Sequence, residues 1–168
     1  DVKEIAFYDK NINKAYNMAE SLGDVFEKIY VAQSVEECVK DCRVITTLTP
    51  SRAGYLCNKM LSNPVHINAV GADAEGKREL SDDVLYNCST LVYDDKEQAT
   101  HSGESQYRKG PTHINRNPHL KEYELKDLLR WPKQTLKEKI QKKLTIYDST
   151  GLAIEDIAIA EAVYKKLK

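Results

Sequence analysis

The chain has 168 residues, of which 41% are hydrophobic and 30% are charged, and its formal net charge at pH 7 is -1. This length suits one domain with a sizeable core, and the balanced charge excludes a general electrostatic attraction to nucleic acid or to membranes. No apolar run approaches the roughly 20 residues that cross a bilayer, and no signal peptide is evident. We therefore expect no membrane segment and a cytoplasmic location.

Apolar and β-branched runs recur along the chain and predict strands. The continuous run Ile5–Tyr8, which Asp9 closes, predicts a strand that is buried on both faces. Further strands are expected over Val25–Ala32, Val44–Leu48, His66–Val70, Leu91–Asp94 and Leu144–Tyr147. Pro50 follows the third of these runs, so we expect no regular pairing directly after it.

Helical patterns separate these runs. Apolar residues between Ala15 and Leu22 have helical spacing, and Gly23 predicts the end of that helix. A capping-box pattern at Ser34 predicts a short helix that reaches Cys42. Further helices are expected near Tyr55–Leu61, over Leu80–Cys88 and over Leu152–Leu167. Strands that alternate with helices in this way predict an α/β fold with a mostly parallel sheet.

The pattern weakens after Lys96. His101–Lys121 contains two glycines and two prolines and suits a long surface loop. Gln106–Lys143 carries 11 Lys and Arg residues against 4 Asp and Glu residues. Because this segment has few aromatic rings and no RNA-binding motif, a solvated helical face around Glu124–Lys143 explains it better than a nucleic-acid site does.

The four cysteines, Cys38, Cys42, Cys57 and Cys88, do not form a disulfide framework. The first two are four residues apart but have no His or second Cys pair near them in the sequence, so we expect no metal site. Free thiols that pack as small apolar groups are the expectation for all four.

A glycine corner followed by charged residues lies within Val65–Leu80. In open α/β sheets, ligands bind just beyond the carboxyl ends of the strands. This edge would present Gly71, Asp73, Lys77 and Glu79. Taken alone, Asp73 is more often a helix cap and Lys77 a surface lysine.

Asp148–Gly151 forms a second corner of the same kind. Without further information, Ser149 or Thr150 would cap the last helix, and such a role can coexist with ligand contact.

The turn after the first predicted strand contains no glycine. A dinucleotide-binding fold needs a glycine-rich turn after its first strand, where the backbone approaches a pyrophosphate, and an acid at the end of its second strand, which binds a ribose. Asp9 has the place of that acid, so we interpret the chain as starting after the glycine loop, without strand one. The alternative is that Asp9 is only a turn residue.

The chain resembles the nucleotide-binding domain of the ornithine cyclodeaminase/mu-crystallin family, which includes alanine dehydrogenases and ketimine reductases. The resemblance extends over nearly the whole chain, and its most specific parts are INAVGAD (67–73) and DSTGLAIED (148–156). Shorter matches are FYDK (7–10), TTLTPSR (46–52), GKREL (76–80), GE (103–104) and EL (124–125). The stretch WPKQTLKEKIQKK (131–143) departs from the family, in which a shorter, glycine-containing loop is usual.

The resemblance implies a role for each corner residue. Asp73 is expected to be the proton donor and acceptor, and Thr150 to face the substrate. The expected cofactor contacts are Asp9, Thr47, Val70, Gly71, Ala72, Lys77 and Ser149. A carboxylate at Asp9 repels a 2′-phosphate, which favours NAD over NADP.

The implied function is that of the NAD-binding domain of an amino-acid oxidoreductase. Hydride transfer from an α-amino acid to NAD would leave an imine, as in the conversion of ornithine to proline and ammonia or of alanine to pyruvate. The substrate and dimerisation domain of the family has no counterpart in residues 1–168. We therefore expect a truncated domain that is inactive alone and belongs to a homodimeric full-length protein.

Two alternatives remain at this stage. The crystallin branch suggests a non-catalytic protein that binds small ligands, or a ketimine reductase, although the presence of Asp73 favours an enzyme. A scaffold that binds partners through its basic segment is the second alternative and would show salt-dependent binding. In either case, loss of strand one would expose a sheet edge and favour self-association.

Overall fold

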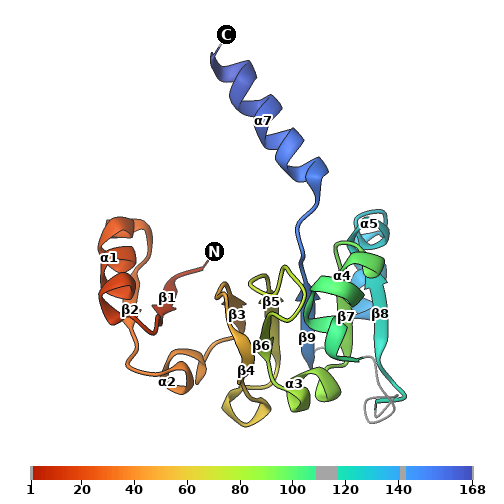
Figure 1. Ribbon diagram of the computed structural model, residues 1–168, viewed down its shortest axis with the longest axis horizontal. Coiled ribbons are helices and arrows are strands. Elements are labelled where there is room, and N and C mark those ends of the chain that lie inside the picture. Colours follow the sequence, from red (N-terminus) through yellow and green to blue (C-terminus); the bar gives the residue numbers. More distant parts are fainter. Residues whose placement is uncertain (1, 109–116, 141–142, 168) are drawn as a thin grey trace.

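The computed structural model describes residues 2–108, 117–140 and 143–167, and it confirms the α/β class. Its central sheet has five strands, all parallel, in the order β3-β5-β9-β7-β8 (Figure 1). These strands are β3 (Val44–Thr47), β5 (Val65–Ala69), β9 (Leu144–Asp148), β7 (Thr90–Tyr93) and β8 (Lys121–Glu124). The predicted strands of this sheet are confirmed within one or two residues at each end, except β8, which the sequence did not indicate.

The core follows from the apolar residues of these strands. Ile67 of β5 and Ile146 of β9 are fully buried, and every residue of β7 is buried. The helix α3 (Asp82–Asn87) adds Val84 and Leu85 to the same cluster. A buried residue such as Ile67 gains about 25 cal/mol for each Å² of apolar surface removed from water, so the sheet centre carries most of the hydrophobic stabilisation.

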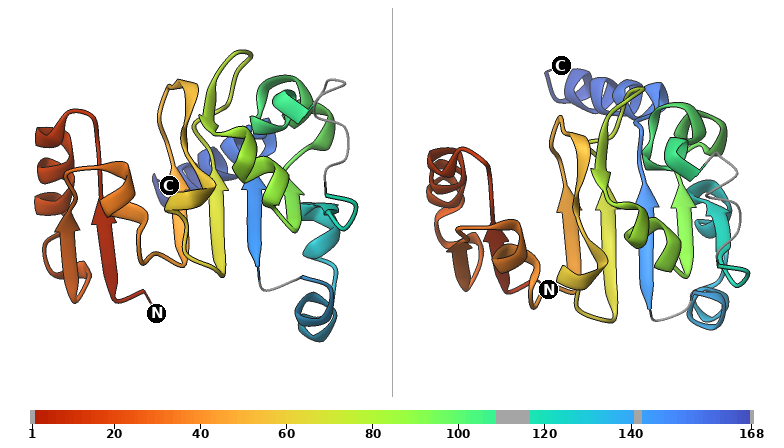
Figure 2. Two further views of the ribbon diagram at one scale, coloured as in Figure 1. Left: turned by 90° about the horizontal axis from the view of Figure 1, so that it is seen from below. Right: turned by 60° about the horizontal axis from the view of Figure 1, so that its bottom comes forward.

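A separate two-stranded parallel sheet lies at one end of the molecule (Figures 1 and 2). It consists of β1 (Glu4–Phe7) and β2 (Lys28–Val31), joined by α1 (Ile12–Leu22), which ends at Gly23 as predicted. The expectation that the first strand is buried on both faces is wrong, because Glu4 is exposed and the other three residues are half-buried. Among the described residues, β1 pairs only with β2, and β3 pairs only with β5.

The helix α2 (Val35–Val39) starts where the capping box predicted and is shorter than expected. Ser34 Oγ accepts a hydrogen bond from Glu37 N at 3.1 Å. The reciprocal bond differs from a regular capping box, since the Glu37 carboxylate accepts from Gln33 N rather than from Ser34 N.

The prediction of a helix near Tyr55–Leu61 is wrong. Arg52–Leu56 is instead the strand β4, which pairs in parallel with β6 (Arg78–Leu80) in a third sheet. A short 3-10 helix, η2 (Asn58–Met60), follows it. Leu80 therefore belongs to a strand, and the helix expected from this residue is the shorter α3.

The prediction of a long surface loop over His101–Lys121 is also wrong for the first residues of this range. The helix α4 (Lys96–Ser102) runs into η3 (Glu104–Arg108), in which Glu104 and Ser105 are buried. Residues 109–116 of the expected loop lie outside the described residues. The basic face expected around Glu124–Lys143 consists of the end of β8 and two short helices, α5 (Leu125–Leu128) and α6 (Lys133–Lys139).

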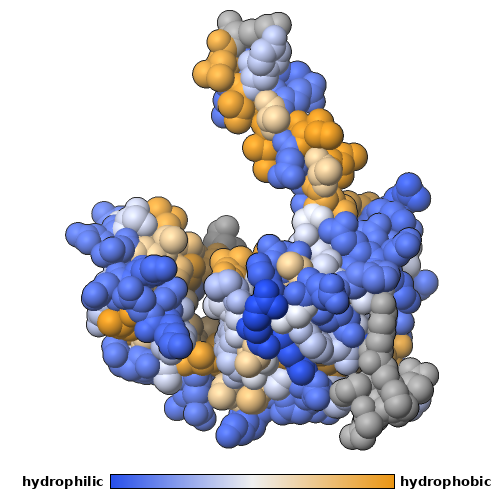
Figure 3. Space-filling model, viewed as in Figure 1, coloured by the Kyte–Doolittle hydropathy of each residue, from blue (hydrophilic) through white to orange (hydrophobic). Residues whose placement is uncertain are grey.

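The last helix, α7 (Ala153–Leu167), projects from the body beyond the carboxyl ends of the central strands (Figure 1). Its apolar side chains cover much of its visible surface (Figure 3), and Ile154, Ile157 and Ile159 are each at least 65% exposed. Within the described residues, no helix has both the length and the apolar character that crossing a membrane requires. All four cysteines are free, as expected.

Candidate functional site

The carboxyl ends of β3, β5, β9 and β7 meet at one edge of the central sheet, because these strands are parallel neighbours. Backbone hydrogen bonds tie the residues that follow them together. Val70 N and Gly71 N both donate to Thr47 O at 3.1 Å, and Ser149 N donates to Ala69 O at 2.9 Å. The structure therefore brings together four of the residues that the sequence assigned to cofactor binding.

Gly71 lies where the loops after β3 and β5 touch. A Cβ atom at Gly71 would lie 2.5 Å from Thr49 N and 2.6 Å from Glu79 Cδ. Only glycine fits between these atoms, so the corner depends on this residue.

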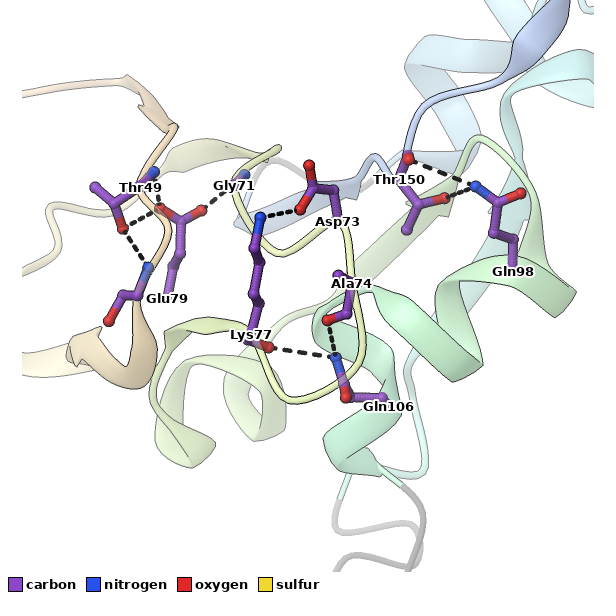
Figure 4. Close-up of polar contacts among 10 residues, drawn as sticks. Thr49, Gly71, Asp73, Ala74, Lys77, Glu79, Gln98, Gln106 and Thr150 are labelled. Carbon is purple, nitrogen blue, oxygen red and sulfur yellow. Dashed lines mark hydrogen bonds and ion pairs between the residues drawn. The ribbon is translucent and has the colours of Figure 1, made fainter.

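Glu79 joins the two loops, as Figure 4 shows. Its Oε1 accepts from Thr49 N at 2.6 Å, Thr49 Oγ1 at 2.7 Å and Tyr55 Oη at 3.0 Å, while its Oε2 accepts from Gly71 N at 2.9 Å. The expectation that the edge presents Glu79 is wrong, because this side chain is fully buried. An unpaired buried carboxylate would be costly, but this one accepts four hydrogen bonds. Glu79 therefore fixes the loops after β3 and β5 to each other.

Asp73 and Lys77 lie on the exposed side of the same loop and form an ion pair. Their side chains are 51% and 25% exposed, respectively, so both are accessible to a ligand. No helix follows Asp73: Lys77 N donates to Ala74 O in a turn that leads into β6. The helix-cap alternative for Asp73 is therefore wrong.

The second corner is held by Asp94, at the end of β7, which the sequence did not single out. The Asp94 carboxylate accepts from Thr150 N at 2.6 Å, Gly151 N at 2.8 Å and Thr150 Oγ1 at 3.1 Å. Ser149 Oγ also donates to it at 3.3 Å. The backbone of this corner is thus fixed, and it lies beside the Gly71 corner because β9 is next to β5.

Two further buried acids lie beneath both corners. Asp148 accepts from Glu104 N at 3.0 Å and from Ser105 Oγ at 2.6 Å, and burial raises its pKa to about 6. Glu104 accepts from Glu79 N at 2.6 Å, and burial raises its pKa to about 8, with the neighbouring carboxylates of Asp148 and Glu79 adding to the effect. In the sequence, Asp148 directly follows an apolar run and Glu104 directly follows a glycine, and these positions were the signals for the two acids.

The structure does not bring Asp9 to this edge. Asp9 follows β1 in the separate sheet, and its Oδ1 accepts from Asn11 N at 2.7 Å, as the turn-residue alternative expects. No hydrogen bond among the described residues joins it to the other predicted contacts.

Thr47 and Ala72 are buried, with exposed fractions of 4% and 0%. Thr47 Oγ1 is a buried oxygen with no hydrogen-bond partner among the described residues. An unpaired hydroxyl at the end of a strand leaves a donor and an acceptor for a further group. A cavity of about 380 Å³ lies elsewhere, between Lys96, β8 and Trp131, and none of the predicted residues lines it.

Comparisons with known proteins agree on one family. The sequence profile of the ornithine cyclodeaminase/mu-crystallin family matches residues 1–168. An alanine dehydrogenase of Archaeoglobus fulgidus is 36% identical over 160 residues, which are 90% of this chain and 48% of that protein. An ornithine cyclodeaminase of Brucella abortus is 30% identical over 169 residues, which are 99% of this chain and 44% of that protein.

Solved structures give the same result. An archaeal alanine dehydrogenase dimer with bound NAD matches with a TM-score of 0.77 and 32% identity, over 98% of this chain and 49% of that one. A lysine cyclodeaminase matches with a TM-score of 0.78 and 26% identity, over 98% of this chain and 45% of that one. The chain thus spans about half the length of the relatives it matches.

Proposed function

Because the chain belongs to the ornithine cyclodeaminase/mu-crystallin family, we propose that it is the nucleotide-binding part of an NAD-dependent oxidoreductase that acts on an α-amino acid. One observation carries the proposal: Asp73, Ser149 and Thr150 follow two neighbouring parallel strands, at the edge where such sheets bind ligands. The relatives include an alanine dehydrogenase structure with bound NAD, which supports a nicotinamide cofactor.

The residues at the edge fit the nicotinamide half of such a cofactor. We assign the contact surface to the backbone of Val70, Gly71 and Ala72, to Ser149, and to Thr47, whose buried hydroxyl lacks a partner. Lys77 lies beside them, paired with Asp73. Bound NAD would accept the hydride from the substrate α-carbon.

For the adenosine half, Asp9 remains our proposed ribose contact, and its carboxylate favours NAD over NADP. The turn in which it lies has no glycine to approach a pyrophosphate. We therefore propose that residues 1–168 form a truncated domain, and that a further part of the source protein supplies the phosphate-binding loop, the groups for the substrate carboxylate and the dimer contacts.

The chemistry assigned to Asp73 is proton transfer. As the α-carbon loses hydride, the amino group loses a proton and a C=N bond forms. The Asp73 carboxylate can take that proton, release it to solvent, and then deprotonate the water or side-chain amine that adds to the imine. Lys77 holds this carboxylate in place, and Thr150 faces the substrate from the neighbouring strand. Alanine and ornithine are both candidate substrates.

A reductase acting in the reverse direction is the second candidate. Curated relatives include a Δ1-pyrroline-2-carboxylate reductase of Bacillus cereus at 28% identity and a ketimine reductase mu-crystallin of Macropus fuliginosus at 30%. Hydride transfer to a C=N bond uses the same residues, so only the substrate distinguishes the two directions.

The test begins with calorimetric titration of the chain and of the intact source protein with NAD and NADP. We expect the intact protein to bind NAD more tightly than NADP, and the isolated chain to bind NAD weakly and to show no turnover. Absorbance at the reduced nicotinamide band then follows alanine and ornithine with NAD, and cyclic imines with NADH. An intact protein that binds neither nucleotide would overturn the proposal. Turnover by the isolated chain would contradict the expectation that this chain is inactive alone.

A further inference from the structure

One side chain of η3 holds the loop that carries Asp73 and Lys77. Gln106 Oε1 accepts from Gly76 N at 2.9 Å. Its Nε2 donates to Lys77 O at 3.3 Å, with Ala74 O at 3.5 Å (Figure 4). The same amide group therefore contacts this loop as donor and as acceptor.

A second amide, from α4, holds the other corner in the same way. Gln98 Nε2 donates to Thr150 Oγ1 at 2.9 Å, and Thr150 O is 3.4 Å away (Figure 4). It also donates to Gly151 O at 2.8 Å. The two glutamines thus extend from one continuous segment, α4 to η3, to the two corners of the site.

This segment is itself fixed to the sheet. At its centre, Asp148 accepts from Glu104 N at 3.0 Å and from Ser105 N at 2.9 Å, and all three residues are buried. Glu104 in turn accepts from Glu79 N and Leu80 N. The glutamines therefore extend from a rigid base, and being neutral they place no new charge beside Asp73.

We propose that Gln106 and Gln98 are positioning residues that fix Asp73 and Thr150 relative to each other for the proton and hydride transfers. The proposal rests on the proposed function for the roles of Asp73 and Thr150. The bracing itself is a physical property of the chain and can be tested without cofactor. Because misplacement of a catalytic group by about 1 Å can cost roughly 100-fold in rate, loss of one brace should be measurable.

The first experiment is amide hydrogen exchange by mass spectrometry on the chain with Gln106→Leu or Gln98→Leu. Gln134→Leu is the matched control, because within the described part of the chain the side chain of this glutamine hydrogen-bonds only with Glu138, in the same helix α6. We expect Gln106→Leu to raise exchange about tenfold in the peptide over 72–78 alone, and Gln98→Leu to do so over 149–153 alone. Equal acceleration in all peptides, or none in these two, would overturn the bracing.

The second experiment measures steady-state kinetics in the intact source protein. We expect Gln106→Leu to lower kcat at least tenfold while the KM for NAD changes less than about twofold, and Gln134→Leu to leave both unchanged. Local loosening without a change in kcat would overturn the positioning role and leave the proposed function intact. A wild-type protein that binds no nucleotide would instead overturn the proposed function, and with it the catalytic part of this inference.

Discussion

Glu104 is a buried carboxyl group that has hydrogen bonds at only one of its two oxygens. Its Oε1 accepts from Glu79 N and Leu80 N, while its Oε2 is buried and has no partner among the described residues. Burial raises its pKa to about 8, which favours the protonated form at neutral pH. A neutral Glu104 also avoids repulsion between three neighbouring acids beneath the site.

This pKa predicts a fall in stability as pH rises. The folded-state pKa of Glu104 lies above its ordinary value of 4.5. The contribution of this group to stability is therefore fully present below pH 4.5 and is lost as the pH rises to about 8. We expect the free energy of unfolding to fall by up to about 1.4 kcal/mol per pH unit between about pH 6.5 and 8. Urea denaturation across this range measures the slope.

Glu104→Gln should remove most of that slope, because the amide oxygen still accepts from the two backbone groups and carries no charge. Glu124→Gln is the control. The pKa of Glu124 is lowered, mainly by its hydrogen bond with Lys126, so Glu124 stays ionised between about pH 6.5 and 8 and adds no slope to the stability in this range. An unchanged slope in Glu104→Gln would assign the pH dependence to another group.

Asp73 offers a second test at the level of one residue. We expect Asp73→Asn to lower turnover in the intact source protein at least ~100-fold, because an amide cannot take a proton. The unfolding free energy should change by less than about 0.5 kcal/mol, since the ion pair is partly exposed. Asp82→Asn is the control: Asp82 also forms an i,i+4 ion pair with a cation, Arg78, and its side chain is 45% exposed. Similar losses in both variants would exclude a specific role for Asp73.

At the level of elements, the central sheet was predictable because its strands are apolar runs closed by an acid, a proline or a glycine corner. Leu144–Asp148, for example, alternates buried and half-buried residues and ends in an acid. Such local patterns determine β3, β5, β7 and β9. Of the site, the two corners were predictable for the same reason.

The pairing of β4 with β6 was not predictable, because it depends on contact between two short segments, of five and three residues, that are separated in the sequence. Gly54 lets β4 approach the backbone of Leu80, a contact that the local sequence does not indicate. Similarly, the buried part of η3 depends on Asp148, more than 40 residues away. The hydrogen-bond roles of Glu79 and Asp94 were missed for the same reason, because most of their partners lie in loops that follow other strands.

Gly54→Ala tests this close approach. A Cβ there would lie 2.5 Å from Leu80 O and 2.9 Å from Ser81 Cα. Both are backbone atoms, which cannot move away by a change of side-chain rotamer. We expect a loss of about 1–3 kcal/mol in the free energy of unfolding, as for other overpacked sites. Ala53→Val, at an exposed position of the same strand, should change it by less than about 0.5 kcal/mol. Equal effects would show that β4 does not need the close contact.

At the level of the whole molecule, α7 presents apolar side chains on more than one side. A helix that is apolar around its circumference is usually buried, whereas Ile157 and Ile159 are 68% and 65% exposed. Within the described residues, β1 and β3 each pair with a strand on one side only, and such edges favour pairing with another chain. Both features favour association of the chain with itself.

We therefore expect the sedimentation coefficient of the chain to increase with concentration. Ile157→Lys combined with Ile159→Lys should reduce that increase, while Leu129→Lys, which replaces an apolar residue that is 77% exposed outside α7, should not. A wild-type chain that stays monomeric at high concentration would contradict the expectation. An unaltered profile in the double variant would assign association to the sheet edges instead.

The position of β9 in the sheet has a consequence for the order of folding. β9 lies between β5 and β7, with Ile146 in register with Ile67 on one side and with Leu91 on the other. This central strand follows all the other described strands in the sequence, so during synthesis β5 and β7 emerge from the ribosome well before the strand that joins them. Because such long-range parallel pairing is slow and leaves strand edges open, we expect the edges of β5 and β7 that contact β9 to stay unpaired until β9 has been synthesised.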